Sequence, residues 1–228
     1  LYTVYATGAY MDSKPHLAHM TEHTMFCTKD GAYDDIIKQY SDETNAYTRD
    51  EHTTYYTTNI PNEHFQTVLD YELRRMTSLE VDQECFDYEY GRLEKELEGD
   101  HTIINDWNRD LQRTVFGTGY AGYPVDGSIE MVDVIEFYRQ WYQPNRAAVV
   151  IVGSIGEKNW NAVLEGFGSL ENRENPQYSF SPLKTDTVTL EYPFGKERTS
   201  WLWRGPTIEN PDEWLYWTLL AKTSLLDR

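Results

Sequence analysis

The segment His19-Met20-Thr21-Glu22-His23 brings two imidazoles and a carboxylate together if it is helical. At about 100° per residue, His19, Glu22 and His23 fall within an arc of roughly 100° on one helix face. Two imidazole nitrogens one turn apart can bind a single Zn²⁺, and a carboxylate between them can reach a water on that metal. The alternative is a surface helix that happens to carry two histidines. The segment therefore predicts a short helix with either a metal-binding face or a plain solvated one.

Composition indicates a folded protein with an acidic surface. The 228 residues suffice for one large domain or two small ones, and 39% hydrophobic and 14% aromatic residues set the chain apart from disordered proteins. The formal net charge of −18 comes from 38 acidic and 20 basic residues. Such a charge repels phosphates and anionic lipid, so we expect no nucleic acid partner and no membrane surface. It attracts basic peptides, although an acidic surface also serves solubility alone.

Cysteine use and hydropathy bear on the compartment. The two cysteines, Cys27 and Cys85, are too few for a disulfide framework and lack CxxC spacing, so we expect buried or free thiols in a reducing compartment. No apolar run approaches the ~20 residues of a membrane span. No signal peptide is visible, although the chain starts at Leu1 and not at Met, so a preceding leader is compatible with it. We expect a soluble protein, with the cytoplasm favoured over a periplasm or an organelle matrix.

Residue patterns divide the chain into helical and extended segments. Strands are expected at 1–11, twice within 45–60 around a turn near Arg49, at 147–152 as a short buried strand, and at 188–192 and 199–203. Helices are expected at 17–27, 33–40, 65–76, 83–115, 129–142, 158–170 and 211–226. A glycine-rich loop is expected at 117–127, and 171–182 is the most linker-like stretch.

A catalytic zinc usually has three protein ligands and one open position, and carboxylates are the better source of the third. The remaining histidines are isolated in the sequence: His16, His52, His64 and His101. The expected helix from residue 83 carries Glu89, Glu94, Glu96 and Glu98. Glu89 and Glu96 are seven residues apart and lie within about 20° of each other, whereas Glu94 falls on the opposite edge of the apolar stripe. Glu89 and Glu96 can therefore serve one site together, unless this is simply a solvated helix face.

Several motifs spread over most of the chain resemble the insulinase and pitrilysin peptidases, a family that includes mitochondrial processing peptidase. The order H-x-x-E-H is the inverse of the commoner zinc-peptidase motif and is the signature of inverted zinc peptidases. The other matching segments are HLAHMTEHTMF around the histidines, NAYT with Tyr55 downstream, Glu89 and Glu96, Gly119-Tyr120 with Pro124, Trp141 to Asn145, and Val149 to Gly153.

The resemblance implies a zinc-dependent endopeptidase. Carried over residue by residue, His19, His23 and Glu96 would bind Zn²⁺. Glu22 would be the general base for a zinc-bound water that hydrolyses peptide bonds of peptides or unfolded segments. Glu89 would support the site from behind the ligands.

The resemblance also implies a fold, a substrate-binding element and a partner. The fold would be α+β, a two-layer sandwich of a mostly antiparallel sheet with helices packed on one face. Asn45 and Ala46 would lie on an edge strand that pairs with substrate backbone, the alternative being a plain core hairpin. We expect 1–170 to form the zinc-binding N-terminal domain and 171–182 the linker-like stretch. Residues 183–228 would begin the following strands and helix of the same half, which is truncated at both ends.

Family members pair two homologous halves around a chamber, and the second half supplies an Arg and a Tyr to the substrate. The expected partners are therefore a peptide substrate and a second half, in the same chain, a homodimer or a heterodimer. An alternative is a half that is inactive alone and acts as a structural or partner subunit of a two-half peptidase. A non-catalytic assembly subunit and a zinc hydrolase of non-peptide substrates are further alternatives. The chain departs from the family pattern at His16, Thr21 and Cys27, none of which is a ligand, although Thr21 weakens the apolar anchor beneath the metal helix.

Overall fold

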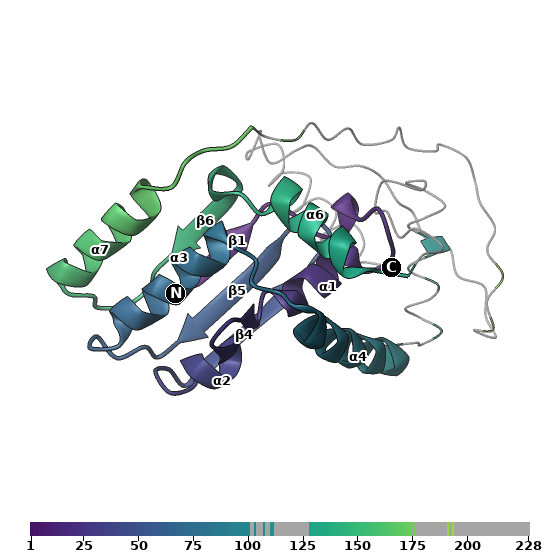
Figure 1. Cartoon of the computed structure of the whole chain (residues 1–228), viewed down its shortest axis with the longest axis horizontal. Coiled ribbons are helices and arrows are strands. Elements are labelled where there is room, and N and C mark those ends of the chain that lie inside the picture. The colour runs from purple at the N-terminus through teal and green to yellow at the C-terminus, as the bar shows by residue number, and fades with distance from the viewer. Residues whose placement is uncertain are drawn as a thin grey trace, which may run out of the picture. The chain divides into compact units, whose positions relative to one another are not determined.

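The computed structural model describes residues 1–100 and 128–174, together with the isolated positions 103, 107, 110, 111, 176, 191 and 193. The chain divides into two units, Leu1–Leu190 and Glu191–Arg228. Nearly all described residues belong to the first unit, and it carries every element discussed below (Figure 1). The expected linker at 171–182 and the final segment from residue 183 lie largely outside the described residues.

A four-stranded antiparallel sheet forms the centre of the first unit, in the order β4-β5-β1-β6. Its strands are β1 (Tyr2–Tyr5), β4 (Glu43–Thr48), β5 (Thr53–Thr58) and β6 (Ala147–Val150). Threonine and tyrosine dominate β4 and β5, and such residues suit a pleated surface. The face carrying Thr3, Tyr5 and Tyr55 is fully buried, and the register pairs Thr3 with Tyr55, so these side chains point toward the same layer.

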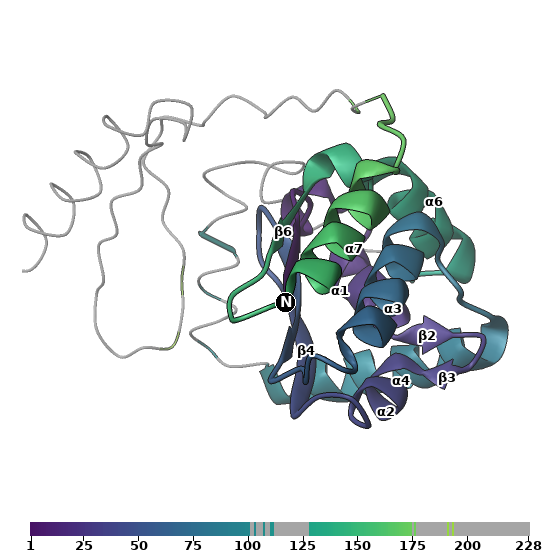
Figure 2. The same cartoon turned by 90° about the vertical axis from the view of Figure 1, so that its left-hand side faces the viewer.

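The helices cover that buried face. They are α1 (Leu17–Thr24), α2 (Tyr33–Ile37), α3 (Phe65–Thr77), α4 (Gln83–Asp100), α6 (Met131–Trp141) and α7 (Glu157–Gly168). Figure 2 shows α1, α3, α6 and α7 on one side of the sheet. The main core joins Tyr5 and Tyr55 of the sheet to Met20 of α1, Leu93 of α4 and Val134 of α6. The expected α+β fold, with an antiparallel sheet and helices on one face, is confirmed.

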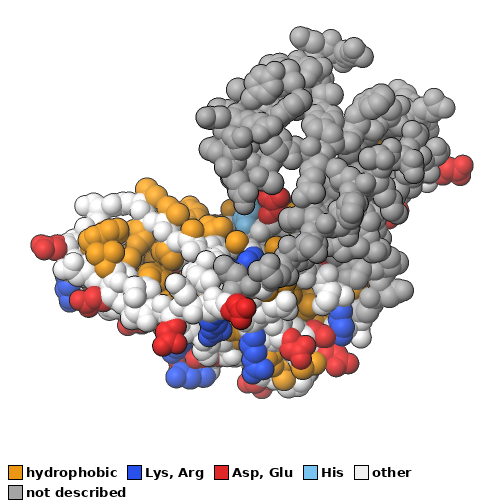
Figure 3. All heavy atoms as spheres, turned by 90° about the horizontal axis from the view of Figure 1, so that it is seen from above, with side chains coloured by type: hydrophobic (Ala, Val, Ile, Leu, Met, Phe, Trp, Pro, Cys, Tyr) orange, Lys and Arg blue, Asp and Glu red, His pale blue; other side chains and the backbone are white. Residues whose placement is uncertain are grey.

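Two expectations about individual elements need correction. The predicted strand 147–152 is confined to 147–150 and is only partly buried, with Val150 47% and Val152 79% exposed. It is the last strand of the sheet that the described residues form. Hydrophobic side chains gather on the described surface (Figure 3), and Val150, Val152, Trp160 and Leu164 are among the exposed ones. The predicted first strand ends at Tyr5, and a short 3-10 helix follows at Ala9–Met11.

Several predicted segments lie wholly or largely outside the described residues: the part of the 83–115 helix beyond residue 100, the loop at 117–127, the strands at 188–192 and 199–203, and the helix at 211–226. Among the described residues, no helix is both long and apolar enough to cross a membrane.

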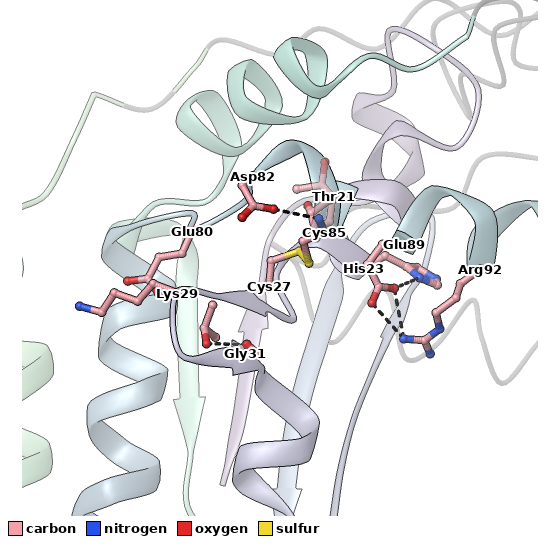
Figure 4. Close-up of a disulfide and its surroundings, with 12 residues drawn as sticks. Thr21, His23, Cys27, Lys29, Gly31, Glu80, Asp82, Cys85, Glu89 and Arg92 are labelled. Carbon is pink, nitrogen blue, oxygen red and sulfur yellow. Dashed lines mark hydrogen bonds and ion pairs between the residues drawn. A yellow bond between two sulfur atoms is a disulfide. The ribbon is translucent and has the colours of Figure 1, made fainter. Parts of the chain in front are cut away.

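The expectation of two unpaired thiols is wrong, because Cys27 and Cys85 form a disulfide. Cys27 opens the small hairpin of β2 (Cys27–Thr28) and β3 (Gly31–Ala32), directly after α1. Cys85 lies in the first turn of α4, so the bond fastens α4 to the end of α1 (Figure 4). The two cysteines are 58 residues apart, and sequence spacing gave no sign that folding brings them together. Disulfides are rare in cytosolic proteins, so the pairing counts against the reducing compartment that was expected.

We expect the double substitution Cys27→Ser and Cys85→Ser to lower the free energy of unfolding by about 2–5 kcal/mol. The bond closes a loop of 58 residues, and a crosslink of that span restricts the unfolded chain by about 4 kcal/mol. Urea unfolding of the oxidised wild type and the double variant measures the difference. The wild type reduced with a phosphine should behave like the double variant. A loss below about 0.5 kcal/mol would show that the crosslink contributes little to stability.

Candidate metal centre

Helix α1 is held so that one face is buried and the other faces a cavity. Leu17, Ala18 and Met20 are buried beneath the helix. The side chain of Asp12 accepts a hydrogen bond from the backbone N–H of Ala18 at 2.7 Å, which satisfies one of the donors that a helix N-terminus leaves open. Thr21, the expected weak point of this packing, is fully buried, and its hydroxyl donates to the Leu17 carbonyl at 2.8 Å. The polar side chain is therefore accommodated without an unpaired hydroxyl.

Helix α4 brings two carboxylates to the histidines of α1. Oε2 of Glu96 lies 3.6 Å from Nε2 of His19 and 3.4 Å from Nε2 of His23. Oε2 of Glu89 lies 3.0 Å from Nδ1 of His23, on the other side of the same ring. Glu94 is exposed and lies outside this group, as its position on the opposite helix edge predicts. The geometric requirement set by the sequence, that the residue-96 carboxylate meets both imidazoles, is thus met.

The donor set fits a single tetrahedral zinc ion. One atom each from His19, His23 and Glu96 lies within 4.8 Å of the others, the only such group of three among the described residues. Two ligand atoms bound to one tetrahedral zinc are about 3.4 Å apart, close to the two Glu96 distances. Two imidazoles and a carboxylate form a ligand set known from catalytic zinc sites, which leaves a fourth position open. These three residues could therefore hold Zn²⁺ without large rearrangement.

The protonation of the histidines suits a cation site. Burial lowers the pKa of His19 to about 4, aided by the neighbouring charges of His23 and His16, so the ring is neutral at physiological pH. The pKa of His23, in contrast, lies above its usual value. Burial by itself would lower this pKa, but the hydrogen bond with Glu89 and the carboxylates of Glu96 and Glu22 outweigh that effect. The surrounding acids therefore favour positive charge at this point, and a bound metal would supply it in place of a proton.

Glu22 lies beside the donor set in a position that suits a base. Its side chain is 7% exposed and accepts a hydrogen bond from the Thr48 hydroxyl of β4 at 2.7 Å. Burial raises the pKa of Glu22, while the Thr48 hydrogen bond and His23 offset part of that rise. The carboxylate is therefore more basic than an exposed one and is held in one orientation by a hydroxyl from the neighbouring strand.

The site opens into a cavity of about 270 Å³. Its lining comes from α1, α4 and β4: His19, Glu22, His23, Phe26, Thr44, Asn45, Ala46, Tyr47, Thr48, Glu89, Arg92 and Glu96. Strand β4 is the outer strand of the described sheet, so its far edge has no strand partner there. Asn45 and Ala46, expected to meet the substrate, therefore lie both on this edge strand and in the cavity wall.

Two residues of the site were not singled out from the sequence. Thr48 is the last residue of the NAYT motif, and strand alternation places it on the helix-facing side with Ala46. Arg92 donates to both oxygens of Glu89 at 3.1 Å. It lies three residues after Glu89 and four before Glu96, and this spacing places it on the same helix face. The sequence spacing thus places both residues on the side of their element that faces the site. Neither threonine nor arginine is a usual zinc ligand, so neither was selected as a candidate.

Comparison with known proteins gives related matches over most of the chain. The family model described as the Peptidase M16 inactive domain matches residues 128–222, downstream of the two helices that carry the candidate ligands. Insulin-degrading enzyme of Mus musculus is 26% identical over 214 residues, which cover 83% of this chain and 20% of that enzyme. The Homo sapiens enzyme is 26% identical over 212 residues, with 82% and 19% covered. The chain thus spans about a fifth of the length of these curated relatives.

Solved structures share the fold. A protease from Helicobacter pylori superimposes with a TM-score of 0.66 at 23% identity, covering 80% of this chain and 47% of that protein. The first half of the periplasmic protease PqqL from Escherichia coli gives a TM-score of 0.68 at 19% identity, covering 81% and 44%. The family model, the curated relatives and the shared fold agree with the motif pattern of the sequence and support a relationship to the insulinase/pitrilysin (M16) family.

Proposed function

We propose that this chain is the metal-binding half of a zinc-dependent endopeptidase that hydrolyses peptide bonds of peptides or unfolded segments. The observation that carries the proposal is the convergence of His19, His23 and Glu96 within 4.8 Å, on a cavity that Glu22 also lines. When bound, zinc supplies a Lewis acid and lowers the pKa of a coordinated water toward about 7.

The protein's own residues would divide the remaining work. His19, His23 and Glu96 hold the metal, and Glu89 keeps the His23 ring oriented through Nδ1. Glu22 takes a proton from the attacking water and can return it to the leaving amine. Thr48 fixes the Glu22 carboxylate through its 2.7 Å hydrogen bond. The outer edge of β4, with Asn45 and Ala46, offers backbone groups to an extended peptide.

A second candidate is a half that binds zinc but is inactive alone. The chain spans only about a fifth of the insulin-degrading enzymes it resembles, and the matching family model is described as an inactive domain. The described residues that line the cavity come from this half alone, and we propose that a homologous half closes it over the substrate. Such a chain would be a partner subunit of a two-half peptidase.

Metal content and cleavage together test these functions. We expect the purified chain, supplied with one equivalent of zinc and passed through a desalting column, to retain about one zinc per chain by mass spectrometry. Cleavage of a fluorogenic unstructured peptide should stop with a chelator and return with added zinc. Zinc retention without cleavage, followed by cleavage when a homologous second half is added, would favour the partner-subunit function. Failure to retain zinc would contradict both and favour an assembly subunit without a metal site.

A further inference from the structure

We propose that Arg92 is a positioning residue of the metal centre, which acts through Glu89 on the ring of His23. The inference deepens the proposed function and rests on it. Arg92 is not a ligand, and its side chain is 46% exposed. It nevertheless contacts the carboxylate that determines how His23 presents its second nitrogen.

The Glu89 carboxylate is shared by two donors from different helices. Oε2 accepts a hydrogen bond from Nδ1 of His23 at 3.0 Å, and both Oε1 and Oε2 accept from Nη1 of Arg92 at 3.1 Å. Figure 4 shows the Glu89 carboxylate joined by dashed lines to the His23 imidazole and to the Arg92 guanidinium. Arg92 and His23 thus satisfy the carboxylate from two sides.

The side chains of Glu89 and His23 are both buried, so the charge of Glu89 must be balanced within the protein. The Glu89 side chain is 4% exposed and that of His23 is 7% exposed, so a negative charge at Glu89 requires a nearby positive group. Arg92 supplies that charge and holds the carboxylate in the plane that receives the Nδ1 proton of His23. This proton on Nδ1 leaves Nε2 as the acceptor nitrogen, and Nε2 is the atom that lies 3.4 Å from Glu96. Without Arg92, the carboxylate loses one of its two fixed contacts and the ring loses its enforced tautomer.

The substitution Arg92→Gln tests whether Arg92 affects zinc binding by positioning Glu89 or only through its positive charge. Loss of a positive charge near a cation site would by itself strengthen zinc binding. Loss of a positioning contact should weaken it, by about tenfold, the low end of what outer-shell substitutions cost. Competition with a chromophoric chelator measures the zinc dissociation constant of each full-length variant. An unchanged or tighter constant for Arg92→Gln would overturn the proposal.

A double-mutant cycle tests whether Arg92 acts through Glu89. We expect Arg92→Gln to change zinc affinity less than twofold in a Glu89→Gln background, because the carboxylate that Arg92 holds is then absent. Additive effects would overturn the proposal. Arg92→Lys should restore most of the affinity, since one nitrogen of Arg92 makes both contacts. Arg74→Gln removes the same charge from a surface ion pair with Asp30 and Glu80 and should leave zinc affinity unchanged.

The tautomer of His23 gives a readout without metal. At a pH above the pKa of His23, long-range ¹H–¹⁵N spectra of the metal-free chain should show the neutral ring protonated on Nδ1 in the wild type and in Arg92→Lys, and a mixture with the Nε2–H form in Arg92→Gln. The same single tautomer in all three would overturn the positioning role. This result does not depend on zinc binding, so failure of the wild type to bind zinc would contradict the proposed function and leave the tautomer measurement to decide the role of Arg92.

Discussion

Glu22→Gln is expected to abolish detectable peptide cleavage while zinc binding persists. General acid–base catalysis by a positioned side chain contributes about 10²–10⁴-fold, and the amide of Gln cannot take a proton from water near neutral pH. Glu22 lies outside the three-residue donor group, so its loss leaves the metal ligands in place. Gln can still accept the Thr48 hydroxyl that Glu22 accepts at 2.7 Å. The measurements are zinc per chain and the rate of peptide hydrolysis, with the second half present if the wild type requires it.

The matched control for this variant is Glu63→Gln, which also converts Glu to Gln. Glu63 is exposed, precedes α3 and is not among the residues that line the cavity. We expect full cleavage from Glu63→Gln. Cleavage by Glu22→Gln at more than a tenth of the wild-type rate would remove Glu22 from the role of base, even if the zinc content were unchanged.

The sequence could predict those parts of the site that depend on the geometry of a single helix or strand. Helical spacing placed His19, Glu22 and His23 on a common face, and the structure has them on α1 with Leu17, Ala18 and Met20 buried behind them. The same periodicity separated Glu96 from Glu94. Which edge of α4 meets α1 depends on packing between the two helices, so local spacing left the direction of Glu96 open. The resemblance to a known family supplied that pairing.

The features that sequence reasoning missed arise between elements. The Cys27–Cys85 disulfide joins residues 58 apart, and a pair of cysteines carries no periodicity that reveals a partner. Thr48 reaches Glu22 only because β4 lies beside α1 in the fold. β6 was expected to be buried because its residues are apolar, but it is the outermost strand of the described sheet and alternate side chains are exposed. Periodicity describes a face of one element, whereas contacts depend on the neighbour that the fold supplies.

Glu96→Gln is expected to weaken zinc binding by more than about 100-fold. The substitution replaces a carboxylate, which lies 3.6 Å and 3.4 Å from the two imidazole nitrogens, by an amide with no charge. Loss of an outer-shell partner alone costs 10–100-fold, and a direct ligand should cost more. Chelator competition measures the dissociation constant. A thermal shift on adding zinc gives an independent check, because a ligand that binds only the folded state raises the melting temperature with its affinity.

The paired variant Glu94→Gln makes the same chemical change two residues away on the same helix. Glu94 is exposed and outside the donor group, and its charge is largely screened by salt. We therefore expect a change in zinc affinity of less than about twofold. Because both variants alter net charge equally, a large difference between them assigns the effect to direct coordination. Equal losses would indicate that the acidic surface attracts zinc without a defined third ligand. A loss confined to Glu94→Gln would mean that α4 turns its other edge toward the histidines and would remove Glu96 from the metal centre.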